Sequence, residues 1–298
     1  MALFEGVSAF PPTPIDQDGV VAVDWLQRRV ERLAAAGVDS IGLLGSTGAY
    51  PYLNRVQRRR AIEAAVEVAR GRTPVMPGVG ALRTDDACAL AADAAAAGAD
   101  AVLLAPVSYT PLTEAEVFAH VKAVGEASDL PICLYNNPVT TRFTFGPDLI
   151  TRLGALPTVR GAKMPAPVDG DFRAELSELA SSGVRIGYSG DVTAAAALSA
   201  GATAWYSVTA GTFPKLALSL ARAAAAGDLA EVERAETMFQ PLWEVLKRHG
   251  GVRTMSAAAG MLGLGDYPPP RPLLPLTGED REALAGAVER LAALEATA

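Results

Sequence analysis

A single lysine in an apolar stretch has the setting in this chain that most favours covalent chemistry. Lys163 follows the β-type run Val159 to Ala162 and precedes Met164 and Pro165, and this proline stops regular structure. No acidic residue stands near it in the sequence to pair with its charge. Removing an unpaired ammonium from water favours the neutral amine, which is the form that adds to carbonyl carbons and makes Schiff bases. The alternative is a lysine whose side chain reaches solvent from a loop.

Hydroxyl-bearing side chains stand in three other short motifs. Gly45 to Gly48 reads Gly-Ser-Thr-Gly, which combines the hydroxyls of Ser46 and Thr47 with a backbone able to point N–H groups at an anion. Tyr135 begins the sequence Tyr-Asn-Asn-Pro, and Tyr109 lies between two prolines. Each motif alone is typical of an ordinary turn, so their meaning depends on the elements that position them.

The chain alternates short β-type runs with amphipathic helices, and it does so eight times. The predicted strands are Gly6 to Phe10, Ser40 to Leu44, Pro74 to Val79, Ala101 to Leu104, Pro131 to Tyr135, the run that delivers Lys163, Val184 to Tyr188, and Ala204 to Val208. Helix signals support the intervening segments, since Asn54 and Thr113 are predicted N-caps and Gly37 and Gly98 end helices.

Eight such units predict a (β/α)8 TIM barrel, because short apolar strands that alternate with helices form a parallel sheet covered by helices. A doubly wound fold is the alternative, but it requires a glycine-rich phosphate loop after the first strand, and Pro11 to Pro14 is not one. In a barrel the chemistry lies at the carboxyl ends of the strands. Lys163, Tyr135 and Ser46 are all predicted to lie there.

The repeating pattern stops near residue 228, and we predict two parts, a barrel over 1–227 and a C-terminal helical extension over 228–298. The extension contains three predicted helices: Leu229 to His249, Arg253 to Leu262 and Gly278 to Leu294. It has little core of its own, so we expect it to pack on the barrel.

Composition limits the class of protein. Half of the 298 residues are hydrophobic and 20% are charged, as expected for one well-buried unit. The formal charge of −7 disfavours a nucleic-acid partner. No leader and no apolar run long enough for a membrane span is evident, so we expect a cytoplasmic protein. Cys88 and Cys133 fit small buried hydrophobes, and with only His120 and His249 we expect no metal site.

Two further stretches have ordinary readings. The basic run Arg55 to Arg60 predicts a solvated helix face rather than a phosphate site. The segment Ser189 to Asp191 either helps to bind substrate or caps the helix that follows, and we favour capping.

These residues resemble the dihydrodipicolinate synthase and N-acetylneuraminate lyase family of pyruvate-handling class I aldolases. The resemblance covers nearly the whole chain and is most specific in Gly-Ser-Thr-Gly, in Tyr-Asn-x-Pro and in the Gly-x-Lys that ends at Lys163. It implies that Lys163 condenses with a 2-keto acid, that Tyr135 shuttles protons with Ser46 as relay, and that Thr47, Gly48 and nearby backbone amides hold the carboxylate. It also implies a homotetramer, a dimer of dimers, that uses no cofactor beyond the covalent imine.

That assignment is chemically consistent by itself. Schiff-base formation needs a neutral amine, a proton donor for the carbinolamine hydroxyl and a base for the C3 proton, and a phenol bonded to a serine can alternate between the last two roles. A separate anion site is needed so that the keto acid binds in one register.

The sequence departs from the synthase pattern around the second substrate. Ala49 and Thr140 stand where the synthases have a glutamate and a carboxylate-binding arginine, although Arg142 is close by. Tyr109 is displaced by one position. Either it still completes the relay of Tyr135 and Ser46, for example from a neighbouring subunit as in relatives, or it has no part in it. Tyr206, beside Trp205, predicts a differently shaped pocket. We therefore expect an aldolase, lyase or dehydratase with another substrate; the alternatives are the synthase itself and a keto-acid-binding protein without turnover.

Overall fold

The computed structural model describes residues 3–298, so the first two residues of the predicted barrel domain lie outside the described residues. Eight parallel strands form the sheet in the order β3-β2-β1-β8-β7-β6-β5-β4. A parallel bridge between Gly78 and Leu103 joins β3 to β4 and closes the barrel. The strands are β1 Gly6–Ala9, β2 Ser40–Leu43, β3 Val75–Pro77, β4 Val102–Leu104, β5 Ile132–Tyr135, β6 Val159–Met164, β7 Arg185–Ser189 and β8 Ala204–Ser207.

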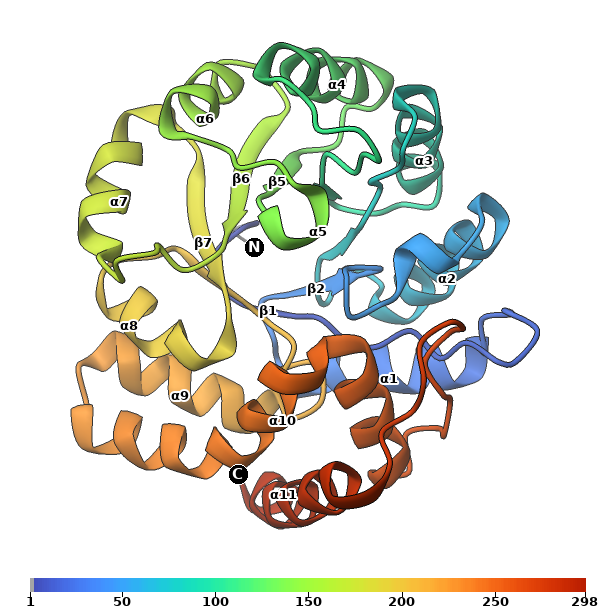
Figure 1. Ribbon diagram of the computed structural model, residues 1–298, viewed down its shortest axis with the longest axis vertical. Helices are drawn as coiled ribbons and strands as arrows, with labels where there is room; N and C mark the ends of the chain where they lie inside the picture. The colour runs from blue at the N-terminus through green and yellow to red at the C-terminus, as the bar shows by residue number, and fades with distance from the viewer. Residues whose placement is uncertain (1–2) are drawn as a thin grey trace.

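Helices surround this barrel, as the view down its axis shows (Figure 1). They are α1 Val23–Ala36, α2 Arg55–Ala69, α3 Thr84–Ala96, α4 Glu114–Ala127, α5 Pro138–Thr141, α6 Pro147–Gly154, α7 Phe172–Leu179, α8 Ala194–Ser199, α9 Pro214–Ala226, α10 Leu229–Met261 and α11 Gly278–Thr297. The predicted (β/α)8 barrel with C-terminal helices is therefore confirmed.

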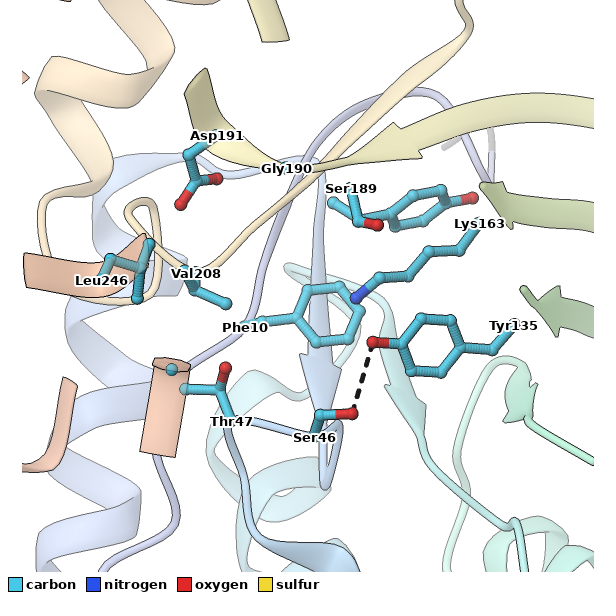
Figure 2. Close-up of a pocket in the computed structure, with 12 residues that line it drawn as sticks. Phe10, Ser46, Thr47, Tyr135, Lys163, Ser189, Gly190, Asp191, Val208 and Leu246 are labelled. Atoms are coloured by element: carbon cyan, nitrogen blue, oxygen red, sulfur yellow. Dashed lines mark hydrogen bonds between the residues drawn. The ribbon is translucent and has the colours of Figure 1, made fainter. Parts of the chain in front are cut away.

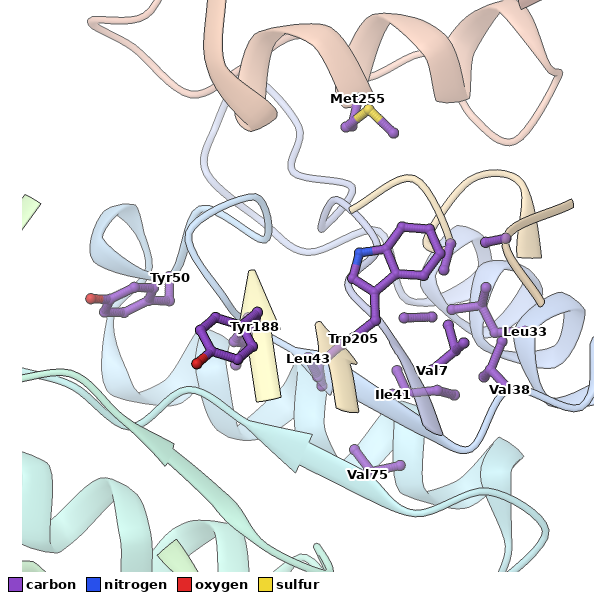
Figure 3. Packing of buried hydrophobic residues seen from close by; sticks show 14 of the residues in the cluster. Val7, Leu33, Val38, Ile41, Leu43, Tyr50, Val75, Tyr188, Trp205 and Met255 are labelled. Carbon is purple, nitrogen blue, oxygen red and sulfur yellow. The ribbon is translucent and has the colours of Figure 1, made fainter. Parts of the chain in front are cut away.

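Alternation along the strands decides which side chains enter the barrel. In β5, Ile132 and Leu134 pack outward in the large cluster between strands and helices, whereas Cys133 and Tyr135 pack inward in a second, smaller cluster. Trp205 and Tyr206 divide in the same way on β8. Figure 3 shows part of the outer cluster, in which Trp205 lies among strand and helix residues.

The C-terminal helices cover one side of the barrel, where α10 packs on α9 and α11 (Figure 1). Helix α10 is broken at Gly250, whose φ of 76° and ψ of 167° are not helical. The break lets the chain turn between Leu246 and Gly251, and both of these residues reach the carboxyl end of the barrel. No helix among residues 3–298 is long and apolar enough to cross a membrane.

The capping predictions are confirmed. The prediction of a solvated arginine face holds for Arg55, Arg59 and Arg60 but not for Arg58, and one other local prediction is wrong. Asn54 and Thr113 each form a capping box with the third residue of their helices. Arg58 is buried rather than solvated, because it donates to the carbonyl oxygens of Leu53 and Gly80 at 3.2 and 2.9 Å. Asp191 does not cap the helix after β7, since its carboxylate turns into the protein interior.

Candidate active site

A cavity of about 160 Å³ opens at the carboxyl ends of the strands (Figure 2). Strands and the turns after them contribute most of its lining: Phe10, Ser46, Thr47, Tyr135, Lys163 and Tyr206. Its far side is formed by Ser189, Gly190 and Asp191 after β7, by Val208 after β8, and by Leu246 and Gly251 of α10. The cavity therefore joins the barrel to the C-terminal helices.

Lys163 occupies the centre of this cavity and is only 3% exposed. Its register partners on the neighbouring strands are Tyr135 and Gly187, so its side chain enters the barrel beside the tyrosine. Nζ lies 3.6 Å from the ring centroid of Phe10, 4.5 Å from that of Tyr135 and 5.8 Å from that of Tyr206. Among residues 3–298 no polar group forms a hydrogen bond or ion pair with Nζ, so only aromatic faces and the cavity surround the amine.

The phenol of Tyr135 belongs to a small group of polar side chains beside the amine. Its Oη shares a hydrogen bond with Oγ of Ser46 at 3.3 Å, and Nδ2 of Asn137 donates to the same Oη at 3.1 Å. Asn137 also reaches Oγ of Ser46 at 3.5 Å, which is long for a hydrogen bond. Catalytic hydrogen bonds are often long before a substrate binds. Tyr135 and Ser46 provide a proton path from the phenol to a second hydroxyl, and Asn137 orients both oxygens.

Tyr206 lies in the same cavity as Tyr135 but has a different polar partner, the thiol of Cys133. Burial raises the pKa of Tyr206 well above its ordinary value, and the thiol of Cys133, 3.4 Å away, adds to this effect. Burial also raises the pKa of Cys133 to about 12. Both groups therefore stay neutral at physiological pH, and of the two only Tyr206 lines the cavity.

The turn after β2 holds Ser46 and Thr47 in a strained backbone. Leu44 and Ala49, on either side of it, adopt left-handed φ values of 53° and 55°, which are uncommon for residues with a side chain. A Cβ at Gly48 would lie 2.9 Å from the Cα of Leu44, so glycine is required there for close packing. Such strain commonly marks functional turns, and it fixes Thr47 at the wall of the cavity.

Thr47 is 5% exposed and faces the break in α10. A Cβ at Gly251 would overlap Oγ1 of Thr47, so the glycine allows the C-terminal helix to approach this hydroxyl closely.

Asp191 is a buried carboxylate at the edge of the cavity whose oxygens are already engaged. Oδ1 accepts from the indole N–H of Trp205 at 2.9 Å, and Oδ2 accepts from the backbone and hydroxyl of Thr209 at 3.0 and 2.6 Å. Burial raises the pKa of Asp191, and the hydrogen bonds from Thr209 and its neighbours act in the opposite direction. Trp243 of α10 donates to Thr209 at 3.0 Å, so this network joins the site to the C-terminal helices.

The structure brings together five of the predicted site residues, and three others lie outside the cavity. Lys163, Tyr135, Ser46, Thr47 and Tyr206 all line it. Of the remainder, Gly48 packs against Leu44 within the turn, and Tyr109 is 91% exposed. Thr140 is exposed on α5, and its hydroxyl donates to the carbonyl oxygen of Asn137. A role for Tyr109 or Thr140 in this pocket stays a prediction.

Sequence reasoning missed several residues that the fold brings to the site. The sequence pattern predicts Phe10 only as part of the first strand, and its place before two prolines is the available signal. Asn137 is predicted only as part of a turn, although an asparagine that makes no helix cap needs another partner. Leu246 and Gly251 are too far along the chain for any local pattern to place them here.

Residues 3–298 contain no group of three or more His, Cys, Asp or Glu side chains placed to hold a metal ion. The site instead presents a buried amine, a phenol with a hydroxyl relay and a turn rich in N–H groups at the carboxyl end of a (β/α)8 barrel. This combination defines a class of enzyme, the aldolases and lyases that work through a lysine Schiff base.

Comparisons with known proteins agree with this class. The model of the dihydrodipicolinate synthetase family matches residues 3–291. A 4-hydroxy-tetrahydrodipicolinate synthase of Methylococcus capsulatus is 35% identical over 95% of this chain and 97% of its own length. The crystal structure of dihydrodipicolinate synthase from Agrobacterium tumefaciens is 52% identical with a TM-score of 0.94, and the match covers 97% of this chain and 98% of that one.

A third relative is a dihydrodipicolinate synthase of Acinetobacter baumannii, solved with pyruvate bound. It is 29% identical with a TM-score of 0.90 over 97% of this chain and 99% of that one. The chain belongs to the dihydrodipicolinate synthetase family. The predicted family and the predicted enzyme class, a Schiff-base aldolase or lyase, are thereby confirmed.

Proposed function

We propose that the protein condenses pyruvate or a similar 2-keto acid with Lys163 and uses the resulting enamine to form or break a carbon–carbon bond. The neutral amine adds to the ketone carbon, and the carbinolamine hydroxyl leaves as water with a proton from Tyr135, which gives the iminium. Tyr135, now a phenolate, takes a proton from C3 and produces the enamine. The enamine carbon attacks an aldehyde, or is released from one in the cleavage direction, and hydrolysis frees Lys163.

One observation carries this proposal: the amine of Lys163 is buried without a polar partner and lies against the ring of Tyr135. An amine that no hydrogen-bond acceptor holds is free to reach a carbonyl carbon placed in the cavity. The turn at Ser46 and Thr47 supplies N–H groups for the substrate carboxylate, which fixes the keto carbon relative to the amine.

Borohydride trapping tests this function directly. Pyruvate and borohydride together should add a reduced pyruvyl mass at Lys163 and at no other lysine. Lys163→Ala should abolish the adduct, whereas Lys122→Ala, which changes an exposed lysine of α4, should leave it unchanged. An adduct that persists in Lys163→Ala would remove Lys163 from the mechanism.

The second substrate separates two versions of this function. The names of the relatives favour the synthase reaction, which condenses pyruvate with aspartate semialdehyde. Thr140, however, supplies no cation for a second carboxylate, and the loss of one charge-assisted hydrogen bond lowers the rate by roughly 10- to 150-fold. We therefore propose a different acceptor. A value of kcat/KM above about 10⁴ M⁻¹s⁻¹ for the semialdehyde, the low end for ordinary enzymes, would restore the synthase reaction.

We also propose that the enzyme acts in the cytoplasm as a dimer of dimers that needs no cofactor. Tyr109, exposed on the loop after β4, would then enter the relay of a neighbouring subunit. Residues 228–298 would form one catalytic unit with the barrel, because Leu246 and Gly251 line the cavity. Light scattering at micromolar concentration should give four times the 30.8 kDa chain mass, and a monomer would contradict the assembly.

A further inference from the structure

The ring of Phe10 lies against the amine of Lys163 and closes the barrel centre on one side of it. The distance of 3.6 Å from Nζ to the ring centroid is that of a close cation–π contact. Phe10 is 1% exposed, and its ring meets that of Tyr206 edge to face with 6.1 Å between centroids. Figure 2 shows the Phe10 ring beside the end of the lysine side chain.

The barrel wall is shaped to admit these two rings. A Cβ at Gly45 would lie 2.7 Å from the Phe10 ring, and a Cβ at Gly42 would overlap the same ring. A Cβ at Gly187 would lie 2.7 Å from the ring of Tyr206. Side chains at these three positions would displace the rings, so the aromatic wall depends on glycines of two segments, β2 with the turn after it and β7.

The space left beside the wall is small. The cavity has a volume of about 160 Å³. An apolar cavity of about 150 Å³ in another protein accommodates benzene, a molecule of about six non-hydrogen atoms. Pyruvate has the same number of non-hydrogen atoms, so a keto acid of that size fits beside Lys163.

We propose that Phe10 is a specificity-determining residue: its ring, backed by Tyr206, limits the 2-keto acid that forms an imine with Lys163 to about the size of pyruvate. The proposal rests on the proposed function, because it concerns the imine at Lys163. A larger group on the keto carbon has to push the ring into packed surroundings, where extra atoms are poorly accommodated. The ring face also stabilises positive charge on the nitrogen, which the iminium retains.

A chain-length series measures this limit. Borohydride trapping at Lys163 is followed by mass for pyruvate, 2-oxobutyrate, 2-oxohexanoate and phenylpyruvate at equal concentrations. For the unaltered protein we expect phenylpyruvate to be trapped at least about 10-fold more slowly than pyruvate. Phe10→Ala should reduce that ratio by about 10-fold or more. Phe172→Leu, a change to a buried aromatic of α7 outside the cavity, should leave the ratio unchanged.

The outcomes separate this inference from the proposed function. If the unaltered protein traps phenylpyruvate as fast as pyruvate, or if Phe10→Ala keeps the original ratio, Phe10 does not set the limit although the imine forms. If no keto acid is trapped by the unaltered protein, the proposed function fails and this inference fails with it. Should thermal melting show that Phe10→Ala is unfolded, Phe10→Leu must shift the ratio in the same direction, and an unchanged ratio overturns the proposal.

Discussion

Arg29 and Lys163 are both 3% exposed, but hydrogen-bond acceptors surround the guanidinium and aromatic rings surround the amine. On α1, the guanidinium of Arg29 donates to the carbonyl oxygens of Pro12, Leu264 and Gly265 at 2.8, 2.9 and 3.0 Å. At the barrel mouth, Lys163 has no such partner among residues 3–298 and faces three aromatic rings and a cavity.

The difference separates a structural cation from a reactive one. Burial lowers the pKa of Arg29 to about 10, so the guanidinium remains charged at neutral pH and holds two distant segments together. No hydrogen-bond acceptor holds the amine of Lys163, so its nitrogen is free to reach a carbonyl carbon placed in the cavity. Burial alone therefore does not indicate function; the partners of the buried group do.

Lys163→Met is the substitution with the largest expected effect, because it removes the buried amine. Turnover and imine trapping should fall below detection, because no other amine lines the cavity formed by residues 3–298. The free energy of unfolding, measured with urea, should stay the same or rise, since a buried amine without partners is replaced by a hydrophobic side chain of similar size. A large loss of stability would mean that Lys163 has a structural role like that of Arg29.

Tyr135→Phe should lower turnover by about 10²–10⁴-fold while pyruvate still binds, because a positioned proton carrier typically contributes that much. Asn137→Ala should act in the same direction and more weakly, since the amide only orients the phenol oxygen. The measurement is the exchange of the C3 protons of pyruvate with deuterated water, followed by NMR. Tyr188→Phe is the matched control, because this phenol bonds Glu175 outside the cavity. Unchanged exchange in Tyr135→Phe would reject the relay.

Arg29→Met should destabilise the fold without a direct effect on chemistry. A buried carbonyl left without its donor costs about 1–3 kcal/mol, and Arg29 serves three of them, so we expect the free energy of unfolding to fall by at least that amount. Arg60→Met, at an exposed position of α2, should change it by no more than about 0.5 kcal/mol. Equal effects of the two variants in urea titrations would show that the carbonyl contacts of Arg29 contribute little.

His120 is a third buried basic group, and its burial disfavours the charged form. We expect its substitution to have the smallest effect. Burial lowers the pKa of His120 below its ordinary value of 6.5, while Thr84 contacts Nδ1 at 3.0 Å. As the pH falls through 6.5, the unfolded chain binds a proton that the folded chain does not. The stability contribution is therefore complete above pH 6.5 and is lost below it, by at most about 1.4 kcal/mol per pH unit.

His120→Gln should remove this slope. Urea unfolding between about pH 7 and pH 5, a range set by the ordinary pKa of histidine, provides the measurement. His249→Gln is the control for the other histidine. If the pH dependence of the unfolding free energy is unchanged in His120→Gln and absent in His249→Gln, it originates from His249 and the prediction is wrong.

The sequence predicts the barrel well because its signals are local. Strand alternation, the caps at Asn54 and Thr113 and the apolar setting of Lys163 each depend on a few neighbouring residues. The surroundings of Lys163 are not local. Phe10 reaches the amine because β1 pairs with β8 and the barrel closes, and this contact requires the complete sheet.

Other errors have the same origin. Arg58 follows the pattern of a solvated helix face, yet the carbonyls of Leu53 and Gly80 approach it only in the folded chain. Asp191 looks like a cap from its neighbours, but the indole of Trp205 and the amide of Thr209 provide stronger partners in the interior. Long-range contacts thus determine whether polar side chains that local patterns assign to the surface are buried.

The residues on either side of the break at Gly250 in α10 complete the site, and they are synthesised late. A ribosome makes the chain from its amino end, so Ser46, Tyr135 and Lys163 emerge before Leu246 and Gly251. The segment that packs against Thr47 is therefore added late in translation. Until then the nascent chain carries its amine in an unfinished pocket, and termination before Leu246 leaves the lysine without the wall that α10 provides.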